Sequence, residues 1–405
     1  MRFPPKPFAL LALVVALFAG GCVTAPPRTD VVLSAEQRLE HNQRVFDRAW
    51  ALVNDKFFDA KFRGVDWAEM KQRYRSDAEK APDDAKLYGV INAMLGELGE
   101  SHNVALSPMR RWEFVSKQRA RIGIGLTHLE DRWIVNEVVP DSPAEKAGVQ
   151  TGWIVQARNG EPLKADASFT LKEGETVAYD FLDQNDQVQS RRMVARFIST
   201  GERRESRELP GGAVYLRFDG FDSKSLHWMS EQLKIHRSAP AAIIDLRTNH
   251  GGTFVSLEFV MGEFFPRAVT VGTFIRRNGS KSEKETLQLF SARYPGNVIL
   301  LTSEATASCA EILAHALRYH NRATLIGRPT AGAVVVSRFY SLPDGGMLQL
   351  AIEDFRGLDG KRLEGVGVQP DIPVALKLSD LRAGIDADLA AAQAKLHGPP
   401  QMVRN

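Results

Sequence analysis

Ser308 could do chemistry, because it stands where the apolar run of NVILLTSEATASCAEILAHAL (residues 297–317) gives way to a helical pattern. A serine at such a junction has the N–H of the next residue, Cys309, beside it and the positive end of a helix dipole behind it. These are the parts of an oxyanion hole, so Ser308 could be a nucleophile. Ser308 and Glu311 also form a capping-box pattern, and taken alone this tetrapeptide favours a helix cap.

A possible base lies about two hundred residues earlier, in the polar turn GELGESHNVALSP that holds Ser101 and His102. Histidine suits proton transfer because its pKa lies near neutral pH. A carboxylate, Glu364, precedes the Gly-rich turn of LEGVGVQPDI. Taken alone, Ser101 and His102 are typical of a polar turn, and Glu364 is typical of a solvated glutamate in a turn. Whether they act together therefore depends on further evidence.

The composition excludes several other classes. The 405 residues carry a formal charge of +3, which falls to about +1 without Arg2 and Lys6 of the leader, and so gives no reason to expect a nucleic-acid partner. No HExxH, CxxC or P-loop spacing occurs, so we expect no metal and no cofactor.

The amino terminus, MRFPPKPFALLALVVALFAGGCVTAPP, has a basic start and an apolar run at 8–18 that is too short to span a bilayer comfortably. AGGC resembles a bacterial lipobox that would lipidate Cys22, although Ala19 stands where leucine is more usual. The alternative is an ordinary signal peptide that ends near a cysteine. Val23 is not the aspartate of inner-membrane retention, which favours the outer membrane.

The chain contains only one other cysteine, Cys309, so a lipidated Cys22 leaves no disulfide within the chain. Residues 22–32 then form a short tether.

The elements that must position these groups fall into three blocks. Residues 33–110 show helical spacing of apolar positions, as in AEQRLEHNQRVFDRAWALVNDKFF. Residues 118–198 alternate like strands with Gly, Asp and Pro between them. From residue 199 strand and helix patterns alternate, which indicates an α/β core in a multi-domain protein.

The middle block resembles a PDZ domain. GIGL matches its carboxylate-binding loop, SPAEKAGVQTGWIV its helix and following turn, and RNGEPL its next strand and hairpin. The resemblance implies that this domain takes an extended peptide as an added strand. The substrate-binding residues it implies are Gly123, Ile124, Gly125 and Leu126. The alternative is a PDZ-like fold that serves only as a spacer.

Three segments resemble parts of the C-terminal processing (tail-specific) serine peptidases and their tricorn-core relatives. They are TASCAEILAHAL, AAIIDLRTNHGG and FDRAWALVNDKFFDAKFRGVDWAEM. The resemblance spans roughly residues 40–375 and implies a crotonase/ClpP-like peptidase core. It makes Ser308 the nucleophile. It implies that the amides of Gly251, Gly252 and Cys309 form the oxyanion hole.

One departure bears on the mechanism. The processing peptidases use a lysine as base, and Ala333 of TAGAVVV stands in its place. The tricorn-core branch instead implies His102 as the base, with Ser101 and Glu364 orienting and polarising it. His250, beside the oxyanion turn, remains an alternative base, and His315, two helical turns after Ser308, is expected to be structural.

The sequence therefore predicts a cell-envelope serine endopeptidase that cuts peptides or unfolded proteins. The rivals are a non-catalytic lipoprotein scaffold that binds peptides or apolar ligands, and an esterase or amidase. The oligomeric state stays open. The predicted divisions are a lipoprotein signal peptide (1–21), a tether (22–32), a helical domain (33–116), a PDZ-like domain (117–198), the peptidase core (199–380), and a C-terminal helix and tail (381–405).

Overall fold

The structure, a computed structural model, describes residues 26–27, 33–164, 169–288 and 293–397. The predicted signal peptide and Cys22 lie outside the described residues. Within the described ranges, no helix has both the length and the apolarity needed to cross a membrane.

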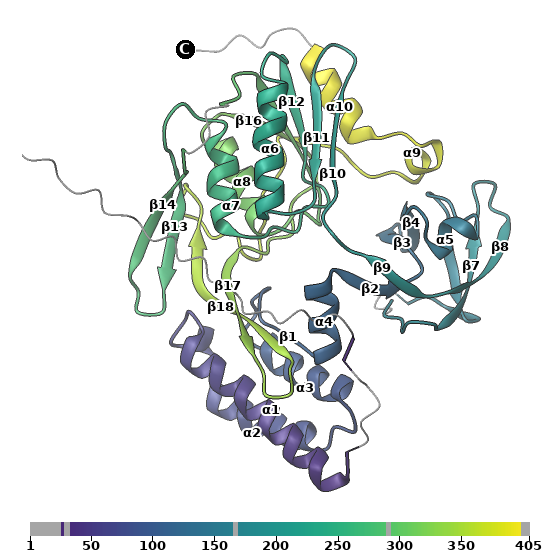
Figure 1. The fold of residues 1–405 in the computed structure, drawn as a ribbon, viewed down its shortest axis with the longest axis vertical. Coiled ribbons are helices and arrows are strands. Elements are labelled where there is room, and N and C mark those ends of the chain that lie inside the picture. Colours follow the sequence, from purple (N-terminus) through teal and green to yellow (C-terminus); the bar gives the residue numbers. More distant parts are fainter. Residues whose placement is uncertain (1–25, 28–32, 165–168, 289–292, 398–405) are drawn as a thin grey trace, which may run out of the picture.

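The amino-terminal block is helical, as expected. Its elements are α1 (Ala35–Lys56), a short 3₁₀ turn (Phe62–Gly64), α2 (Trp67–Glu79), α3 (Asp84–Gly96), strand β1 (Val104–Leu106) and α4 (Pro108–Ser116). Side chains of Ser34, Asp66 and Asp83 accept the N3 amides that begin the three long helices. The apolar stripes of α1 and α3 pack against residues of the later hairpin of β17 (Val335–Ser341) and β18 (Met347–Arg356). The helical block is therefore docked on the core (Figure 1).

The core is built on a six-stranded sheet ordered β10-β11-β12-β15-β16-β19, in which only β10 runs antiparallel to its neighbour. The strands are β10 (Arg204–Glu208), β11 (Val214–Phe218), β12 (Ala241–Asp245), β15 (Asn297–Thr302), β16 (Ala323–Gly327) and β19 (Ile372–Pro373). Alternate residues face opposite sides. Ile244 and Leu300 pack towards α6 (Ser223–Ile235), α7 (Phe254–Gly262) and α8 (Cys309–Tyr319). Ile243 and Ile299 pack towards α10 (Ala387–His397).

A second sheet joins the helical block to the core. Its order is β1-β18-β13-β14, with β17 also paired to β18; β13 spans Thr270–Arg276 and β14 Lys281–Glu285. Ala105 of β1 pairs with Leu348 of β18. Because Ser101 and His102 directly precede β1, this pairing brings them to the core.

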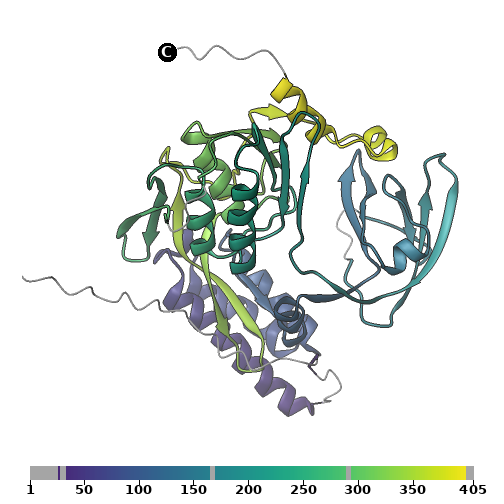
Figure 2. The same cartoon turned by 45° about the horizontal axis from the view of Figure 1, so that its top comes forward.

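Residues 118–199 form a separate β-rich unit with its own apolar core. Its sheet order is β3-β4-β5-β7-β8, with β6 beside β5. The elements are β3 (Ile124–Leu129), β4 (Arg132–Val138), α5 (Pro143–Lys146), β5 (Ile154–Arg158), β6 (Glu161–Pro162), β7 (Thr176–Leu182) and β8 (Val188–Val194). A ribbon of β2 (Gln118–Arg121) and β9 (Arg196–Ser199) carries the unit away from the core (Figure 2).

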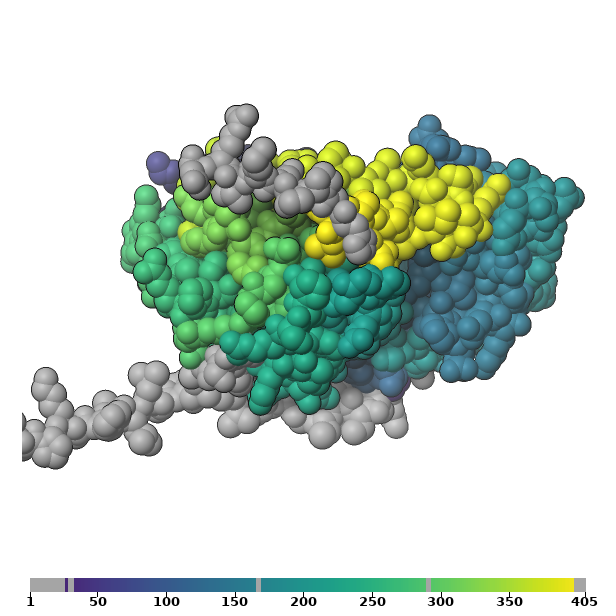
Figure 3. Space-filling view, turned by 90° about the horizontal axis from the view of Figure 1, so that it is seen from above, coloured from purple at the N-terminus to yellow at the C-terminus, as the bar shows by residue number. Residues whose placement is uncertain are grey.

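The carboxyl-terminal segment bridges the β-rich unit and the core (Figure 3). In α9 (Leu378–Ala383), Arg382 donates to the carbonyl of Asp183 and to the carboxylate of Asp186 at 2.6 Å. On the core side, Arg247 donates to Asp386 at 2.7 Å. The predicted multi-domain α/β fold class is confirmed.

Candidate active site

Ser308 lies between β15 and α8 in a backbone conformation that non-glycine residues rarely adopt, with φ 56° and ψ −123°. Such a conformation costs about 1–3 kcal/mol and persists only where the surroundings enforce it. They do so here, because the N–H of Ser308 donates to the carbonyl of Ala333 at 3.0 Å and α8 is buried from Cys309 to Leu317. Strain at a half-buried serine is a feature of functional sites.

Glu311 is the residue that holds this junction together. Its fully buried carboxylate accepts hydrogen bonds from the N–H of Ser308 (3.1 Å), the hydroxyl of Thr330 (2.5 Å), and the N–H groups of Gly332 (2.7 Å) and Ala333 (2.8 Å). Burial raises the pKa of Glu311, while these hydrogen bonds oppose the rise. The N–H of Glu311 donates to the backbone carbonyl of Ser308 at 2.9 Å, so the Ser308 hydroxyl is not needed to satisfy that amide.

The thiol of Cys309 does not compete as a nucleophile. It donates to the carbonyl of Gly252 at 3.4 Å, and burial raises the pKa of the Cys309 thiol to about 12. It therefore stays protonated near neutral pH, and only its backbone N–H can contribute to the site.

The predicted oxyanion turn lies against Ser308. A Cβ built on Gly251 (φ +91°) would lie 2.6 Å from the Cβ of Ser308, so this position excludes any larger residue. The N–H of Gly251, however, already donates to the side chain of buried Asn249 at 2.9 Å. Within the described residues, the N–H groups of Gly252 and Cys309 donate no hydrogen bond to protein. Of the three amides named from the sequence, these two are free and Gly251 is not.

His102 is half-buried in the turn between α3 and β1. Its Nδ1 lies 2.7 Å from the hydroxyl of Ser101, so Nε2 is the ring nitrogen available for proton transfer. Burial lowers the pKa of His102 below its ordinary value of 6.5, and the negative charge of Glu364 opposes this shift. A neutral imidazole near neutral pH is the state that a general base requires.

Glu364 links the His102 turn to the Ser308 loop through backbone groups. One carboxylate oxygen accepts the N–H of Ser101 at 2.7 Å, and the other accepts the N–H of Val334 at 2.5 Å. Val334 follows Ala333, whose carbonyl accepts the N–H of Ser308. No hydrogen bond within the described part of the chain joins His102 to Ser308 directly. Catalytic hydrogen bonds are often long in ligand-free enzymes and tighten with substrate.

His250 and His315, the other two histidines considered near Ser308, differ from His102 in their surroundings. His250 is exposed, and its Nδ1 lies 3.1 Å from the carbonyl of Ala305. His315 is buried in α8, and its Nε2 accepts the N–H of Leu358 at 3.0 Å. His315 thus has the structural role that we expected from its position.

Several groups that hold the site were not predicted from the sequence. Buried Glu100 pairs with Arg362 at 2.6 Å and with Arg63 at 2.5 Å, which ties the Ser101 turn to the loop that carries Glu364. Asn103, on the other side of the turn, accepts the N–H of Ala351 in β18 at 3.0 Å. Charged or amide residues directly beside a candidate Ser-His pair were the one available signal.

In the predicted peptide-binding segment, Gly123 directly precedes β3, the edge strand of its sheet, and Ile124, Gly125 and Leu126 begin that strand. Leu126 and Thr127 line a cavity of about 670 Å³ between the β-rich unit and the core. Thr248 and Ala305, from loops that lead to Gly251 and Ser308, line its other wall. Asp386 of the carboxyl-terminal segment lines it as well.

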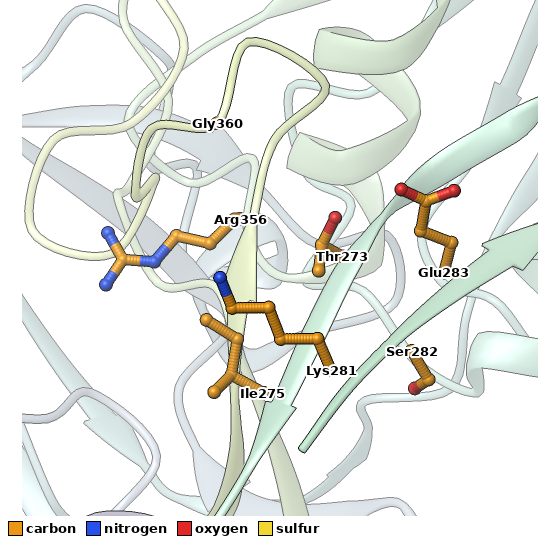
Figure 4. A pocket seen from close by; sticks show the side chains of 7 residues that line it. All are labelled: Thr273, Ile275, Lys281, Ser282, Glu283, Arg356 and Gly360. Carbon is orange, nitrogen blue, oxygen red and sulfur yellow. The ribbon is translucent and has the colours of Figure 1, made fainter. Parts of the chain in front are cut away.

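A second cavity, of about 520 Å³, lies on the β13–β14 hairpin (Figure 4). No residue proposed for chemistry lines it; the lining residues are Thr273, Ile275, Lys281, Ser282, Glu283, Arg356 and Gly360. Among the described residues, the one group of three potential metal ligands, His41, Asp84 and Asp344, is also outside the site.

Two family profiles match this chain. Residues 212–374 match peptidase family S41, and residues 39–96 match the tricorn protease C1 domain. The carboxyl-terminal-processing protease of Synechocystis sp. is 24% identical over 88% of this chain and 87% of its own length. The chloroplastic carboxyl-terminal-processing peptidase 1 of Arabidopsis thaliana is 25% identical over 83% of this chain and 72% of its own length.

Solved structures share the fold. The photosystem II D1 C-terminal processing protease covers 86% of this chain over 98% of its own, with a TM-score of 0.58 and 20% identity. Mature CPAF covers 89% of this chain over 99% of its own, with a TM-score of 0.65 and 12% identity. The peptidase family S41 match, residues 212–374, contains both the Ser308 junction and the Glu364 turn. Residues 212–374 thus form a peptidase family S41 domain and residues 39–96 a tricorn protease C1 domain, and the chain is a serine-type peptidase related to the C-terminal processing proteases.

Proposed function

We propose that Ser308 is the nucleophile and His102 the general base of an endopeptidase that cleaves peptides or unfolded proteins. One observation carries this proposal. The carboxylate of Glu364 binds both the turn that holds His102 and the residue next to Ala333, which in turn binds the N–H of Ser308. The nucleophile and the base come from different blocks of the chain, and this carboxylate joins them.

The chemistry follows from the donors and acceptors. When Nδ1–H of His102 donates to the Ser101 hydroxyl, Nε2 carries the lone pair that takes the proton of Ser308. The alkoxide attacks the peptide carbonyl, and His102 returns the proton to the leaving amine. A water molecule, activated by the same imidazole, then hydrolyses the acyl-enzyme.

The oxyanion is stabilised by the N–H groups of Gly252 and Cys309 rather than by that of Gly251. Neither amide has an acceptor among the residues that the structure describes, and the Cys309 amide opens helix α8, whose dipole adds positive potential there. Gly251 contributes by its small size, because only hydrogen fits between its backbone and Ser308.

The β-rich unit recruits the substrate in this proposal. Among the described strands β3 is the edge strand of its sheet, and an extended chain can add to it as a strand, as in PDZ domains. The cavity of about 670 Å³ lies between β3 and the loops that precede Gly251 and Ser308, although neither Ser308 nor His102 lines it.

We also propose that the enzyme is anchored in the cell envelope by a lipid on Cys22, with the outer membrane favoured by Val23. The support is the leader pattern in the sequence alone. Labelling of the expressed protein with a palmitate analogue, lost in Cys22→Ser, tests this anchor.

A non-catalytic scaffold is the rival function, and the peptidase relatives do not favour it. The decisive experiment compares peptide hydrolysis by the wild type, Ser308→Ala, His102→Ala and His250→Ala, with folding checked by circular dichroism. We expect loss in the first two variants and retained turnover in the third. Binding of peptides by the wild type without any cleavage would support the scaffold, and loss only in His250→Ala would make that residue the base.

A further inference from the structure

Three side chains from distant parts of the sequence converge where the helical block meets the β17–β18 hairpin. His41 lies on α1, Asp84 on α3 and Asp344 in the turn of the hairpin. Nε2 of His41 is 3.4 Å from Oδ1 of Asp84 and 3.8 Å from Oδ2 of Asp344. One ligand atom from each residue lies within 4.8 Å of the other two.

Among these three side chains, the imidazole of His41 has a buried nitrogen that makes no hydrogen bond within the described residues. Nε2 of His41 is inaccessible to solvent and has no hydrogen-bond partner among the described residues. The side chain of Asp344 is also buried, with only 2% of its surface exposed. A buried nitrogen without a hydrogen bond costs free energy, and this one faces two carboxylates at ion-pair distance.

The geometry suits a small cation. Ligands held at about 2.0–2.1 Å around a tetrahedral Zn²⁺ lie about 3.3–3.5 Å from one another. The two separations from His41 are 3.4 and 3.8 Å, and all three ligand atoms lie within 4.8 Å of one another, so side-chain rotations must bring the ligands closer together around an ion. One neutral imidazole and two carboxylates together carry a charge of −2, which balances a divalent transition ion, and water can serve as the fourth ligand.

The carboxylates are also held by outer partners, as metal-binding carboxylates usually are. The guanidinium of Arg38 donates to Oδ1 of Asp84 at 2.6 Å. Asp344 accepts the hydroxyl of Tyr88 at 2.9 Å and the N–H of Gly346 at 2.9 Å. Burial and the charge of Asp344 raise the pKa of Tyr88, which keeps its hydroxyl a donor.

We propose that His41, Asp84 and Asp344 bind one divalent transition ion of the Zn²⁺ class, which clamps the helical block to the β17–β18 hairpin. The site is structural, because it is distinct from the groups around Ser308. Its effect on the peptidase is indirect. The clamped α3 leads into the Ser101–His102 turn, and the clamped β17 follows directly from Val334.

A competing arrangement uses the same atoms without metal. A protonated His41 could form an ion pair with the two carboxylates, and Arg38 already balances the charge of Asp84. The two arrangements differ in their response to metal. The ion pair makes stability insensitive to added Zn²⁺, whereas the metal site makes stability depend on it.

The test uses the full mature protein, stripped with EDTA and dialysed. Zn²⁺ binding is measured by isothermal titration calorimetry, and Co²⁺ binding by its visible spectrum. The variants are His41→Gln and Asp344→Asn. The matched control is His236→Gln, because the His236 side chain is 15% exposed against 17% for His41 and lies 3.7 Å from a single carboxylate, that of Glu208.

The proposal predicts one equivalent of Zn²⁺ for the wild type and His236→Gln, and a Tm about 3–5 °C higher at a hundredfold excess over Kd. Both properties should be lost in His41→Gln and Asp344→Asn, with circular dichroism confirming that His41→Gln is folded. Absence of Zn²⁺ and Co²⁺ binding by the wild type overturns the proposal, and so does unchanged binding by folded His41→Gln. A Tm that falls in His41→Gln but never responds to metal establishes the ion pair instead.

Discussion

The turn that carries Ser308 and the turn that carries His102 are held in opposite ways. Ser308 is fixed by the core: its N–H is bonded twice, and Glu311 beneath it satisfies four donors. His102 lies in a turn beside exposed Ser101, and within the described part of the chain its ring is hydrogen-bonded only to the Ser101 hydroxyl. The nucleophile is therefore prepared by the fold of one domain, whereas the base depends on how two blocks dock.

This difference has a mechanistic meaning. A strained serine must be held continuously, because relaxation of its backbone would remove the oxyanion geometry. A base needs correct placement only when substrate is bound. Contacts at Ser308 should therefore control stability and chemistry together, whereas contacts at His102 should control chemistry with little effect on stability.

The largest effect is expected for Ser308→Ala. Loss of the nucleophile should lower kcat by roughly 10⁴-fold or more, with the Tm close to that of the wild type because only one oxygen is removed. Steady-state hydrolysis of a fluorogenic peptide measures this loss. Activity within tenfold of the wild type would assign the nucleophile elsewhere.

His102→Ala should be the next most severe change, lowering kcat by roughly 10²–10⁴-fold, because the proton of Ser308 then has no acceptor. KM should change little. The double variant Ser308→Ala/His102→Ala should be no worse than Ser308→Ala, since groups that act as a unit are not additive. An additive double variant would contradict a shared mechanism.

Glu364→Gln tests the link between the two turns. Its carboxylate binds two backbone N–H groups, and an amide can accept only one of them well. The misplaced turn should lower kcat by roughly 10–100-fold, with a loss of stability of about 1–2 kcal/mol. A matched change at Glu353, the half-buried ion-pair partner of exposed Arg276, should alter neither quantity.

Glu311→Gln, in contrast, should have its main effect on stability. Whichever way the new amide lies, its NH₂ group must face two donors, so the free energy of unfolding should fall by about 3 kcal/mol. Urea unfolding followed by circular dichroism measures this change. Stability equal to that of the wild type would show that Glu311 does not hold the Ser308 junction.

The pH dependence should show the smallest effect. Because burial lowers the pKa of His102, the acid limb of kcat/KM should have its midpoint below 6.5. The negative charge of Glu364 raises that pKa, so Glu364→Gln should move the midpoint further down. A midpoint above 6.5, or an upward shift in Glu364→Gln, would show that another group controls the limb.

The blocks of the fold could be predicted because each shows a periodic pattern of apolar residues in the sequence. The helical spacing before residue 100, the strand alternation after 118 and the strand–helix alternation after 199 all appear in the structure. The apolar stripe of α8 also placed Ser308 at a strand-to-helix junction, and the structure has that junction.

The hydrogen bonds of the site could not be predicted from the sequence. Glu311 was visible only as half of a capping box, although its main partners come from the loop of residues 330–333. Gly251 was expected to donate to the oxyanion, yet Asn249 binds its amide because the turn folds back on itself. Such contacts depend on loop geometry at long sequence separation, which no local pattern records.

The most direct test of the central claim is labelling by a serine-reactive fluorophosphonate, with the modified residue mapped by peptide mass spectrometry. We expect one adduct, on Ser308, forming at least about 100-fold more slowly in His102→Ala and at an unchanged rate in His250→Ala. An adduct on another residue, or labelling of His102→Ala as fast as the wild type, would contradict the account.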